Sequence, residues 1–376
     1  MKIVVNTRLL LKNKLEGIGW FSYETLQRMV NNHPEHQFFF LFDRPYSDKF
    51  VFATNVTPVV IGPPTRHPIL WYIWFEWQLP KLLKQLKADL FVSPDGYLSL
   101  SSKVPQIPVI HDINFVHRPK DLPFTSRWYY NHFFPKFAHK AKQIVTVSNY
   151  SKNDITNTYQ VNPEKIDVVY NGVNKLYQPL KKEEQIKVRK KYAGSNPYFL
   201  YVGALHPRKN ILGLLKAFEQ YKNINSNNYK LVLVGSEMFG NKEAQLFYQR
   251  MLHRDDIIFT GRVPSSELAK LLASAQALVF VPFFEGFGIP IIEAMVSGTP
   301  VICSKTTSLP EVGGDAAFYV DPHDTNSIAE ALKQLTDNEQ LRAQMIDNGF
   351  KQCQQFSWDK TAQLFWGSIQ KVIDNL

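Results

Sequence analysis

Short apolar runs alternate with longer amphipathic segments along almost the whole chain. In the first half the runs are bounded by polar residues, Pro or Gly, and they lie at residues 2–6, 37–42, 89–92, 107–110 and 143–147. Runs of this form are typical of strands that are buried on both faces of a sheet. Between them, segments such as 19–32 and 72–87 have the apolar spacing of amphipathic helices.

The alternation is cleaner in the second half. It predicts strands at 198–202, 230–234, 257–260, 277–281 and 300–302, and helices at 210–222, 241–252, 265–275, 290–297 and from about 325. Strands that alternate with helices indicate parallel sheets with helices on both faces. We therefore expect an α/β fold with two doubly wound, Rossmann-like domains.

A domain boundary is expected near Gln178-Pro179. Asn171-Gly172 ends a run there, and the charged stretch 181–184 follows. A chain of 376 residues also exceeds what one hydrophobic core usually serves. We expect an N-terminal domain over 1–178, a C-terminal domain over 179–357, and a last helix over 358–376 that Ser357 caps.

Composition excludes several classes of protein. With 44% hydrophobic and 20% charged residues the chain is globular, not disordered or fibrous. Cys303 and Cys353 have neither disulfide-framework nor zinc-ligand spacing. The longest apolar run, 69–75, is too short to cross a bilayer, and the first residues lack the pattern of a signal peptide. The expected location is the cytoplasm.

The net charge of +10 is concentrated in the first half of the chain. Residues 1–178 contain 21 Lys and Arg against 13 Asp and Glu, which gives +8, and the remainder gives +2. A basic surface suits nucleic acid, an anionic membrane or a phosphorylated ligand. Because the chain has no recognisable nucleic-acid module, we expect no nucleic acid among its partners.

The most specific motif is the stretch 284–293, Phe-Glu-Gly-Phe-Gly-Ile-Pro-Ile-Ile-Glu. It follows a predicted strand, and Pro290 is favoured in the first turn of a helix, so residues 286–289 form a strand-to-helix turn that suits an anion. Glu285 and Glu293 can then face one crevice at the carboxyl edge of the sheet. The alternative is a helix-capping glycine loop with two solvated glutamates.

A second candidate site follows the strand 198–202, which ends at Gly203. Asn210 can cap the next helix, so Arg208 and Lys209 lie beside a helix N-terminus. Cations next to a positive dipole end are unfavourable unless an anion binds there. The pair therefore indicates a phosphate pocket, although a solvated Arg-Lys pair is the alternative if it stands alone.

Two further features lie in the first half. Gly17-Ile18-Gly19 comes between the first strand and the first helix, where two glycines allow close backbone approach to a ligand. The loop lacks the third glycine of a dinucleotide fingerprint. His111 ends the strand 107–110 and is either structural or catalytic. There is no Asp-x-Asp motif, so we expect no dedicated metal site and no cofactor.

These motifs together resemble the retaining family-four glycosyltransferases of the GT-B fold. Glu285 to Glu293 reads as their E-x7-E signature, and further matches extend along nearly the whole chain. The other matching stretches are 17–21, 111–112, 147–151, 171–173, 202–203, 208–210, 261–264 and 308–312. The resemblance implies two Rossmann-like domains that face each other across a cleft, with the last helix crossing back to the N-terminal domain.

The resemblance also implies roles for individual residues. The donor would be a nucleotide sugar of the UDP-glucose or GDP-mannose type, held mainly by the C-terminal domain, and the acceptor a saccharide or lipid-linked saccharide on the N-terminal one. Catalytic roles fall on His111, Arg208, Lys209 and Glu285. Donor-binding roles fall on Gly17, Gly19, Gly203, Val263, Gly286, Phe287, Gly288, Ile289 and Glu293. In this sequence Trp20 replaces an Arg that many relatives have.

Several alternatives remain open at this point. A nucleotide-sugar epimerase, a sugar phosphorylase and a non-catalytic binding subunit can share the same architecture. The segments 69–77 and 124–137 are dense in aromatic residues, which indicates either core packing or an exposed patch. An exposed patch beside Lys81, Lys84, Arg127 and Lys136 would suit peripheral contact with an anionic membrane.

Overall fold

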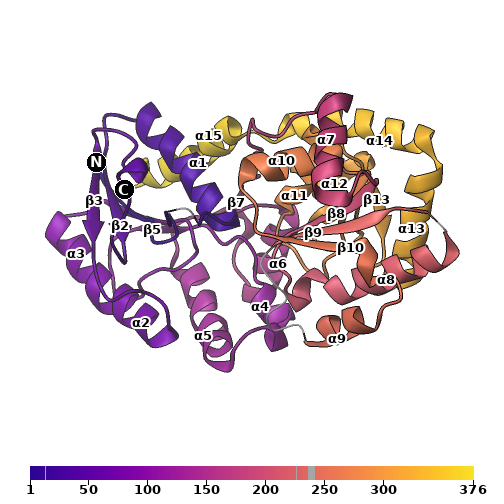
Figure 1. The fold of residues 1–376 in the computed structure, drawn as a ribbon. Helices are drawn as coiled ribbons and strands as arrows, with labels where there is room; N and C mark the ends of the chain where they lie inside the picture. The colour runs from indigo at the N-terminus through magenta and orange to yellow at the C-terminus, as the bar shows by residue number, and fades with distance from the viewer. Residues whose placement is uncertain (13, 226, 236–241) are drawn as a thin grey trace. The chain divides into compact units, whose positions relative to one another are not determined.

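The computed structural model describes every residue except 13, 226 and 236–241. It divides into two compact units (Figure 1). Unit 1 comprises Met1–Gly172 together with Ser357–Leu376, and unit 2 comprises Val173–Phe356.

Unit 1 is built on a parallel sheet with the strand order β3-β2-β1-β4-β5. The central strand β1 pairs Val4 with Phe39 of β2 and with Phe91 of β4. A parallel bridge between Val109 and Val145 leads on to the pair β6-β7. The strands are β1 (Lys2–Asn6), β2 (Gln37–Phe42), β3 (Val56–Val60), β4 (Leu90–Ser93), β5 (Gln106–Pro108), β6 (Ile144–Thr146) and β7 (Ile166–Val168).

The helices of unit 1 pack around a core rich in aromatic residues. Trp74, Phe75, Phe91 and Phe137 are fully buried in it. The helices are α1 (Gly17–Asn32), α2 (Pro68–Ile73), α3 (Leu79–Leu86), α4 (Asn114–His117), α5 (Phe124–Lys140), α6 (Asn149–Tyr159) and α15 (Trp358–Ile373). The segment 72–87, predicted as one helix, divides into the end of α2, a π-helical turn over Trp74–Gln78, and α3.

The last helix, α15, packs on α1 in unit 1, as Figure 1 shows for the yellow and indigo helices. Ser357 caps it, with its side chain accepting a hydrogen bond from the Lys360 amide. Phe21 of α1 lies against Phe365, with ring centroids 5.6 Å apart. The return of the last helix to the N-terminal unit, which the resemblance implies, is therefore confirmed.

Unit 2 is a second parallel sheet, with the order β10-β9-β8-β11-β12-β13. Its strands are β8 (Tyr198–Val202), β9 (Lys230–Val234), β10 (Ile257–Gly261), β11 (Ala277–Phe280), β12 (Val301–Ser304) and β13 (Ala317–Val320). The helices are α7 (Lys182–Ala193), α8 (Ile211–Ile224), α9 (Lys242–Arg250), α10 (Ser265–Ser274), α11 (Ile289–Val296), α12 (Leu309–Gly313), α13 (Thr325–Asp337) and α14 (Glu339–Gln352). The α/β, doubly wound architecture expected from the sequence is confirmed for both sheets.

The strands that the apolar pattern did not predict are β3, β7 and β13. Each lies at the edge of its sheet, and each has residues that are partly exposed. An edge strand is shielded on fewer sides, so it does not need an uninterrupted apolar run. In β3 the Pro58 residue also breaks the pattern, and proline within a sheet is tolerated mainly at an edge.

The chain changes unit at Gly172, whereas the sequence predicts the change at Gln178. The segment between these residues belongs to unit 2 because Tyr177 is buried there and hydrogen-bonds Glu293 of α11. Across the described ranges, no helix is long and apolar enough to span a bilayer.

Candidate active site

The candidate site in unit 2 lies where the order of strands reverses, between β8 and β11. In open parallel sheets this reversal point, at the carboxyl ends of the strands, is where ligands bind. Two loops meet there. Arg208 Nη1 donates to the Phe284 carbonyl over 2.8 Å, and the Phe283 amide donates to the Arg208 carbonyl over 3.0 Å. The motif around Arg208 and the motif that begins at Phe284, which are distant in the sequence, are thus joined by hydrogen bonds in the structure.

Glu285 joins the two cations of this site. Its Oε1 lies 3.3 Å from Arg208 Nη1 and also forms an ion pair with Lys209 Nζ. The three side chains are largely buried, with 11%, 20% and 14% of their surface exposed in the order Glu285, Arg208, Lys209. One carboxylate against two cations leaves a net positive charge in a poorly hydrated site, which suits a phosphorylated ligand.

The turn from β11 to α11 requires glycine at position 288. Gly288 has φ = +99° and is the N-cap residue of α11, with Pro290 in the first turn as predicted. A Cβ atom at Gly288 would lie 2.7 Å from Leu309 Cδ2. The Ser308 hydroxyl shares its proton between the carbonyls of Glu285 and Phe287, and these contacts fix the turn to the start of α12. Gly286 and Ile289 lie in the same turn.

Glu293 lies one turn further along α11 and has a different environment. The burial of its carboxyl raises its pKa to about 7, against the opposing effect of a hydrogen bond with the Tyr177 hydroxyl. No hydrogen bond or ion pair joins Glu293 to Glu285 in the part of the chain that the structure describes. The two carboxylates of the motif therefore have separate partners: Glu285 the cations, and Glu293 a phenol.

Sequence reasoning did not identify Tyr177. It is 116 residues from Glu293 in the sequence and lies beside the domain boundary expected near Gln178-Pro179. The available indication was a single aromatic residue, beside Leu176, between Lys175 and Pro179. Because linkers rarely bury their side chains, a buried tyrosine there indicates a structural or binding role.

The remaining candidates of unit 2 also follow strands. Gly203 directly follows β8 and has φ = +146°, and its amide donates to the Val234 carbonyl over 2.9 Å. Val263, partly exposed, follows β10. Asn210 is the N-cap residue of α8, but its side chain makes no capping bond and instead donates to the carbonyls of Val281 and Pro322. The capping role predicted for the Asn210 side chain is wrong, because it links two loops.

His111 lies in unit 1, at the end of the stretch that follows β5. Its Nε2 is 2.9 Å from the Pro94 carbonyl, which only accepts, so Nε2 carries the proton and Nδ1 is the acceptor. The Phe21 ring packs edge-on, 5.1 Å away between centroids. Burial lowers the pKa of His111 below its usual value, so the ring is neutral at pH 7. A neutral imidazole is suited to orienting a hydroxyl.

Gly17 and Gly19 lie in the first turn of α1 rather than in a loop before it. The hydrogen bond from the Trp20 amide to the Glu16 carbonyl, over 2.8 Å, is already helical. The helix therefore begins earlier than the sequence predicts, and the glycines belong to a helix N-terminus.

No group of three or more His, Cys, Asp or Glu side chains that could hold a metal ion occurs among the described residues. Arg208 and Lys209 supply positive charge at the candidate site of unit 2, where both pair with Glu285.

Comparison with known proteins finds relatives over nearly the whole chain. The model of "Glycosyl transferases group 1" matches residues 182–352, and that of "Glycosyltransferase Family 4" matches residues 15–175. O-antigen chain mannosyltransferase B of Escherichia coli is 29% identical over 370 residues, covering 96% of this chain and 97% of that protein. O-antigen chain mannosyltransferase RfbU of Salmonella typhimurium is 32% identical over 299 residues, covering 77% and 78%.

Solved structures share the fold. Sucrose-phosphate synthase from Thermosynechococcus elongatus superposes with a TM-score of 0.79 at 17% identity, over 100% of both chains. The Anabaena protein HepE, solved in complex with UDP and glucose, gives 0.74 at 19% identity, again over 100% of both chains. The two parallel sheets, the returning last helix and the matched families lead to one conclusion: this chain belongs to the family-four, group 1 glycosyltransferases of the GT-B fold.

Proposed function

We propose that this enzyme transfers a hexose from a nucleoside-diphosphate sugar to a hydroxyl of a saccharide or lipid-linked saccharide, with retention of the anomeric configuration. The observation that carries the proposal is the cluster of Arg208, Lys209 and Glu285 at the reversal point of the unit 2 sheet. Two cations that share one carboxylate keep a net positive charge, which suits a diphosphate. Unit 2 then holds the donor and unit 1 the acceptor.

Each part of the site has a role in this mechanism. Arg208 and Lys209 stabilise the negative charge that develops on the departing diphosphate. Glu285 accepts hydrogen bonds from hydroxyls of the transferred sugar, and Glu293 from those of the ribose. The backbone of Phe287, Gly288 and Ile289 contacts the phosphate and sugar, as do Gly203 and Gly286 nearby, and the Val263 backbone contacts the base. In unit 1, Gly17 and Gly19 contribute to donor binding, and His111 orients the transferred sugar.

Proton transfer needs no side-chain base in this scheme. The leaving phosphate takes the proton of the acceptor hydroxyl on the face of the sugar from which it departs, and this front-face attack retains configuration. The Nε2–H group of His111 donates to the Pro94 carbonyl, so Nδ1 can accept a hydrogen bond from a sugar hydroxyl. It orients the transferred sugar and does not act as a nucleophile.

The relatives favour mannose as the transferred hexose. Two proteins that match most of this chain are O-antigen chain mannosyltransferases by name, and a third relative is an MMP α-(1→4)-mannosyltransferase. We therefore propose GDP-mannose as the donor, ahead of UDP-glucose, in the synthesis of a surface polysaccharide or related glycan.

A thermal-shift screen tests the choice of donor. GDP and GDP-mannose are expected to raise the Tm, because a ligand at 100 times its Kd adds about 2.7 kcal/mol of stability. UDP, UDP-glucose and ADP at the same concentration should shift the Tm less. A larger Tm shift with UDP-glucose than with GDP-mannose would make UDP-glucose the donor. No Tm shift with any nucleotide would contradict the proposed donor site.

Activity is expected to survive removal of divalent metal. Arg208 and Lys209 already supply positive charge where the diphosphate is proposed to bind, so transfer rates should fall less than about twofold in EDTA. The measurement is the initial rate with and without EDTA, followed by addition of Mn²⁺. A complete loss that Mn²⁺ restores would mean that a metal, and not this cation pair, carries the leaving-group charge.

The aromatic segments 69–77 and 124–137 of unit 1 contribute both to core packing and to an exposed patch. Half of their Phe, Tyr and Trp rings are buried in the core, whereas Ile69, Trp77, Phe124 and Trp128 are 55–69% exposed. Ring contacts connect the exposed set: Tyr72 contacts both Trp77 and Phe133, and Phe133 contacts Trp128. Apolar rings beside basic side chains support a peripheral contact with an anionic membrane, where a lipid-linked acceptor would lie.

Co-sedimentation with vesicles tests this contact. Wild-type protein should bind vesicles that contain anionic lipid at low salt. The double variant Trp77→Ser, Trp128→Ser should bind at least about tenfold less, because it loses two exposed indoles that would be buried in the membrane interface. Ile224→Ser, at a 71% exposed residue of unit 2, is the matched control and should bind as wild type does. Failure of the wild type to bind such vesicles removes the membrane contact from the proposal.

A further inference from the structure

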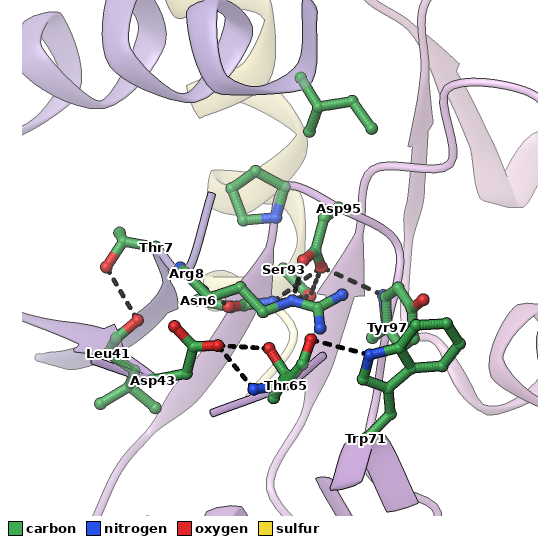
Figure 2. Close-up of polar contacts among 12 residues, drawn as sticks. Asn6, Thr7, Arg8, Leu41, Asp43, Thr65, Trp71, Ser93, Asp95 and Tyr97 are labelled. Carbon is green, nitrogen blue, oxygen red and sulfur yellow. Dashed lines mark hydrogen bonds and ion pairs between the residues drawn. The ribbon is translucent and has the colours of Figure 1, made fainter. Parts of the chain in front are cut away.

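The sheet of unit 1 has its own reversal point, between β1 and β4. By the same rule that marks the donor site in unit 2, a ligand is expected beyond the carboxyl ends of these strands. Buried polar side chains occupy that position (Figure 2). Asn6, the last residue of β1, donates through Nδ2 to Ser93 Oγ over 3.1 Å and to Asp95 Oδ1 over 2.7 Å. Two neighbouring strand ends are thus tied together by polar contacts.

Arg8 lies at the centre of this group. Only 6% of its surface is exposed, and its Nε donates to Asp95 Oδ2 over 2.5 Å. Its Cζ is 4.1 Å from the centroid of the Tyr97 ring and 5.3 Å from that of Phe75. A buried charge is costly unless it is paired and packed. Asp95 and the aromatic rings meet both conditions, so the guanidinium is held in one orientation.

Most hydrogen-bond donors of Arg8 remain without a partner among the described residues. An arginine side chain has five N–H donors. One is used by Asp95, and at most one contacts Tyr97, whose hydroxyl donates to Tyr130 Oη over 3.0 Å. At least three N–H groups are left over on a side chain of which 6% is exposed, and none of its nitrogens is among the fully enclosed unpaired atoms, so these donors border accessible space. A rigidly held guanidinium with free donors at the edge of a buried polar group can accept contacts from the acceptor atoms of a ligand.

The charges around Arg8 are balanced in pairs. Arg8 is compensated by Asp95, and the neighbouring Arg44 by Asp43, with Nε–Oδ1 and Nη2–Oδ2 distances of 2.6 and 2.7 Å. Asp43 also accepts hydrogen bonds from the amide and hydroxyl of Thr65. With no net charge, the group has no electrostatic preference for an anion. Its free donors suit the hydroxyl oxygens of a neutral ligand.

Trp71 packs beside the group, with its indole 5.6 Å from the Tyr97 ring between centroids. Its Nε1 donates to the Thr65 carbonyl over 3.0 Å, which fixes the indole, and Figure 2 shows the Arg8 guanidinium between Asp95 on one side and the Thr65–Trp71 pair on the other. Sites that combine aromatic side chains with a few fixed polar groups are typical of small polar organic ligands. A hexose has both a hydroxylated edge and apolar ring faces.

The group is also adjacent to His111. The imidazole donates to the carbonyl of Pro94, the residue that precedes Asp95, within the same unit. A ligand held by Arg8 therefore lies beside the residue that we assign to the transferred sugar.

We propose that Arg8, held by Asp95 and Tyr97, binds hydroxyl groups of the neutral acceptor sugar. This inference rests on the proposed function, since it places the second substrate of the same reaction. Arg8 would contact the acceptor directly, whereas Asp95 would be a positioning residue that acts through Arg8.

The test uses the full chain and two probes, methyl α-D-mannopyranoside and mannose 6-phosphate, with binding measured by saturation-transfer difference NMR. Arg8→Lys keeps a cation beside Asp95 but loses the fork of donors, and Arg8→Gln removes the charge. Both should weaken binding of the neutral probe at least about tenfold, the loss expected for a charge-assisted hydrogen bond. Arg28→Gln, which removes an arginine paired with Glu24 and Asp359 on the surface of unit 1, should leave binding unchanged.

Two further readouts separate the possible outcomes. The Kd of GDP, measured by calorimetry, should be the same in wild type and all three variants, so a failure of the donor proposal appears there and not in the sugar titrations. The Tm reports folding, and only a variant within a few degrees of wild type is used. Tighter binding of mannose 6-phosphate than of the neutral probe, wild-type binding of neither, or unchanged sugar binding in both Arg8 variants would each overturn the assignment.

Discussion

Replacing Lys209 by Met is expected to lower kcat by about 100- to 1,000-fold. Removing one preorganised donor to charge that develops in a transition state typically has an effect of this size. Lys209 pairs with Glu285 and lies 5.2 Å from the Phe280 ring centroid, so Met keeps the packing while the charge is lost. The measurement is the initial rate of nucleoside diphosphate release at saturating donor and acceptor.

Lys216→Met is the matched control for this variant. Lys216 also lies over a phenylalanine ring, Phe247, at 5.9 Å, but on the face of α8 and outside the site, so its kcat should remain within about twofold of wild type. Glu285→Gln should likewise lower kcat, by about 10- to 150-fold, with little change in nucleoside diphosphate affinity, because it loses a charged hydrogen bond to the sugar. Equal rates in Lys209→Met and Lys216→Met would contradict the role of Lys209.

Replacing Glu293 by Gln is expected to weaken nucleoside diphosphate binding by about 10- to 150-fold at pH 8. Loss of a hydrogen bond to a charged group corresponds to about 1.5–3 kcal/mol, and this carboxylate is the one assigned to the ribose. Unlike Glu285, it has no contact with the cations of the site among the contacts described. Calorimetry with GDP on wild type, Glu293→Gln and Glu285→Gln separates the two roles.

The pH dependence of this binding has a definite sign. The free-state pKa of Glu293 is about 7, so at pH 6 most of the carboxyl is protonated and must lose its proton before it can accept from the ribose as a carboxylate. The affinity of wild type for GDP should therefore fall about tenfold between pH 8 and pH 6 beyond the change seen in Glu293→Gln. The variant serves as the reference because it retains the titration of the nucleotide phosphate.

Parallel curves for wild type and Glu293→Gln over this pH range would show that Glu293 is not ionised on binding. If, in addition, Glu293→Gln bound GDP as tightly as wild type, the assignment of this carboxylate to the ribose would be wrong. Tyr177→Phe should move the wild-type curve toward higher pH, because the Tyr177 hydrogen bond opposes the rise in pKa.

The central strands of both sheets could be predicted from the sequence because they are buried on both faces. Residues 2–6, 37–42, 198–202 and 230–234 are strands with the same bounds in the structure. Such strands need uninterrupted apolar runs, which are visible without any tertiary information. The edge strands β3, β7 and β13 have no such requirement, and their pattern is that of ordinary loops.

The candidate site was predictable only where its residues lie in one short motif. Glu285 and Gly288 stand in a strand-to-helix turn, and Arg208 and Lys209 stand before a helix, so local rules identify them. Contacts between distant segments are different. Arg8 and Asp95 are separated by 87 residues, and nothing in the sequence near either residue indicates the other. The same holds for Tyr177 and Glu293, whose contact depends on how the connection between the units folds back on α11.

Transfer of a hexose from a nucleotide sugar to an acceptor hydroxyl is tested most directly by real-time proton NMR of the anomeric signals during the reaction. GDP-mannose and a mannoside acceptor are mixed with the enzyme, and donor, product and free sugar are followed together. We predict that one GDP is released for each new glycosidic linkage, that the product has the α configuration of the donor, and that little donor is consumed without acceptor. Epimerised donor, a sugar 1-phosphate, a β-linked product or no donor consumption at all would contradict it.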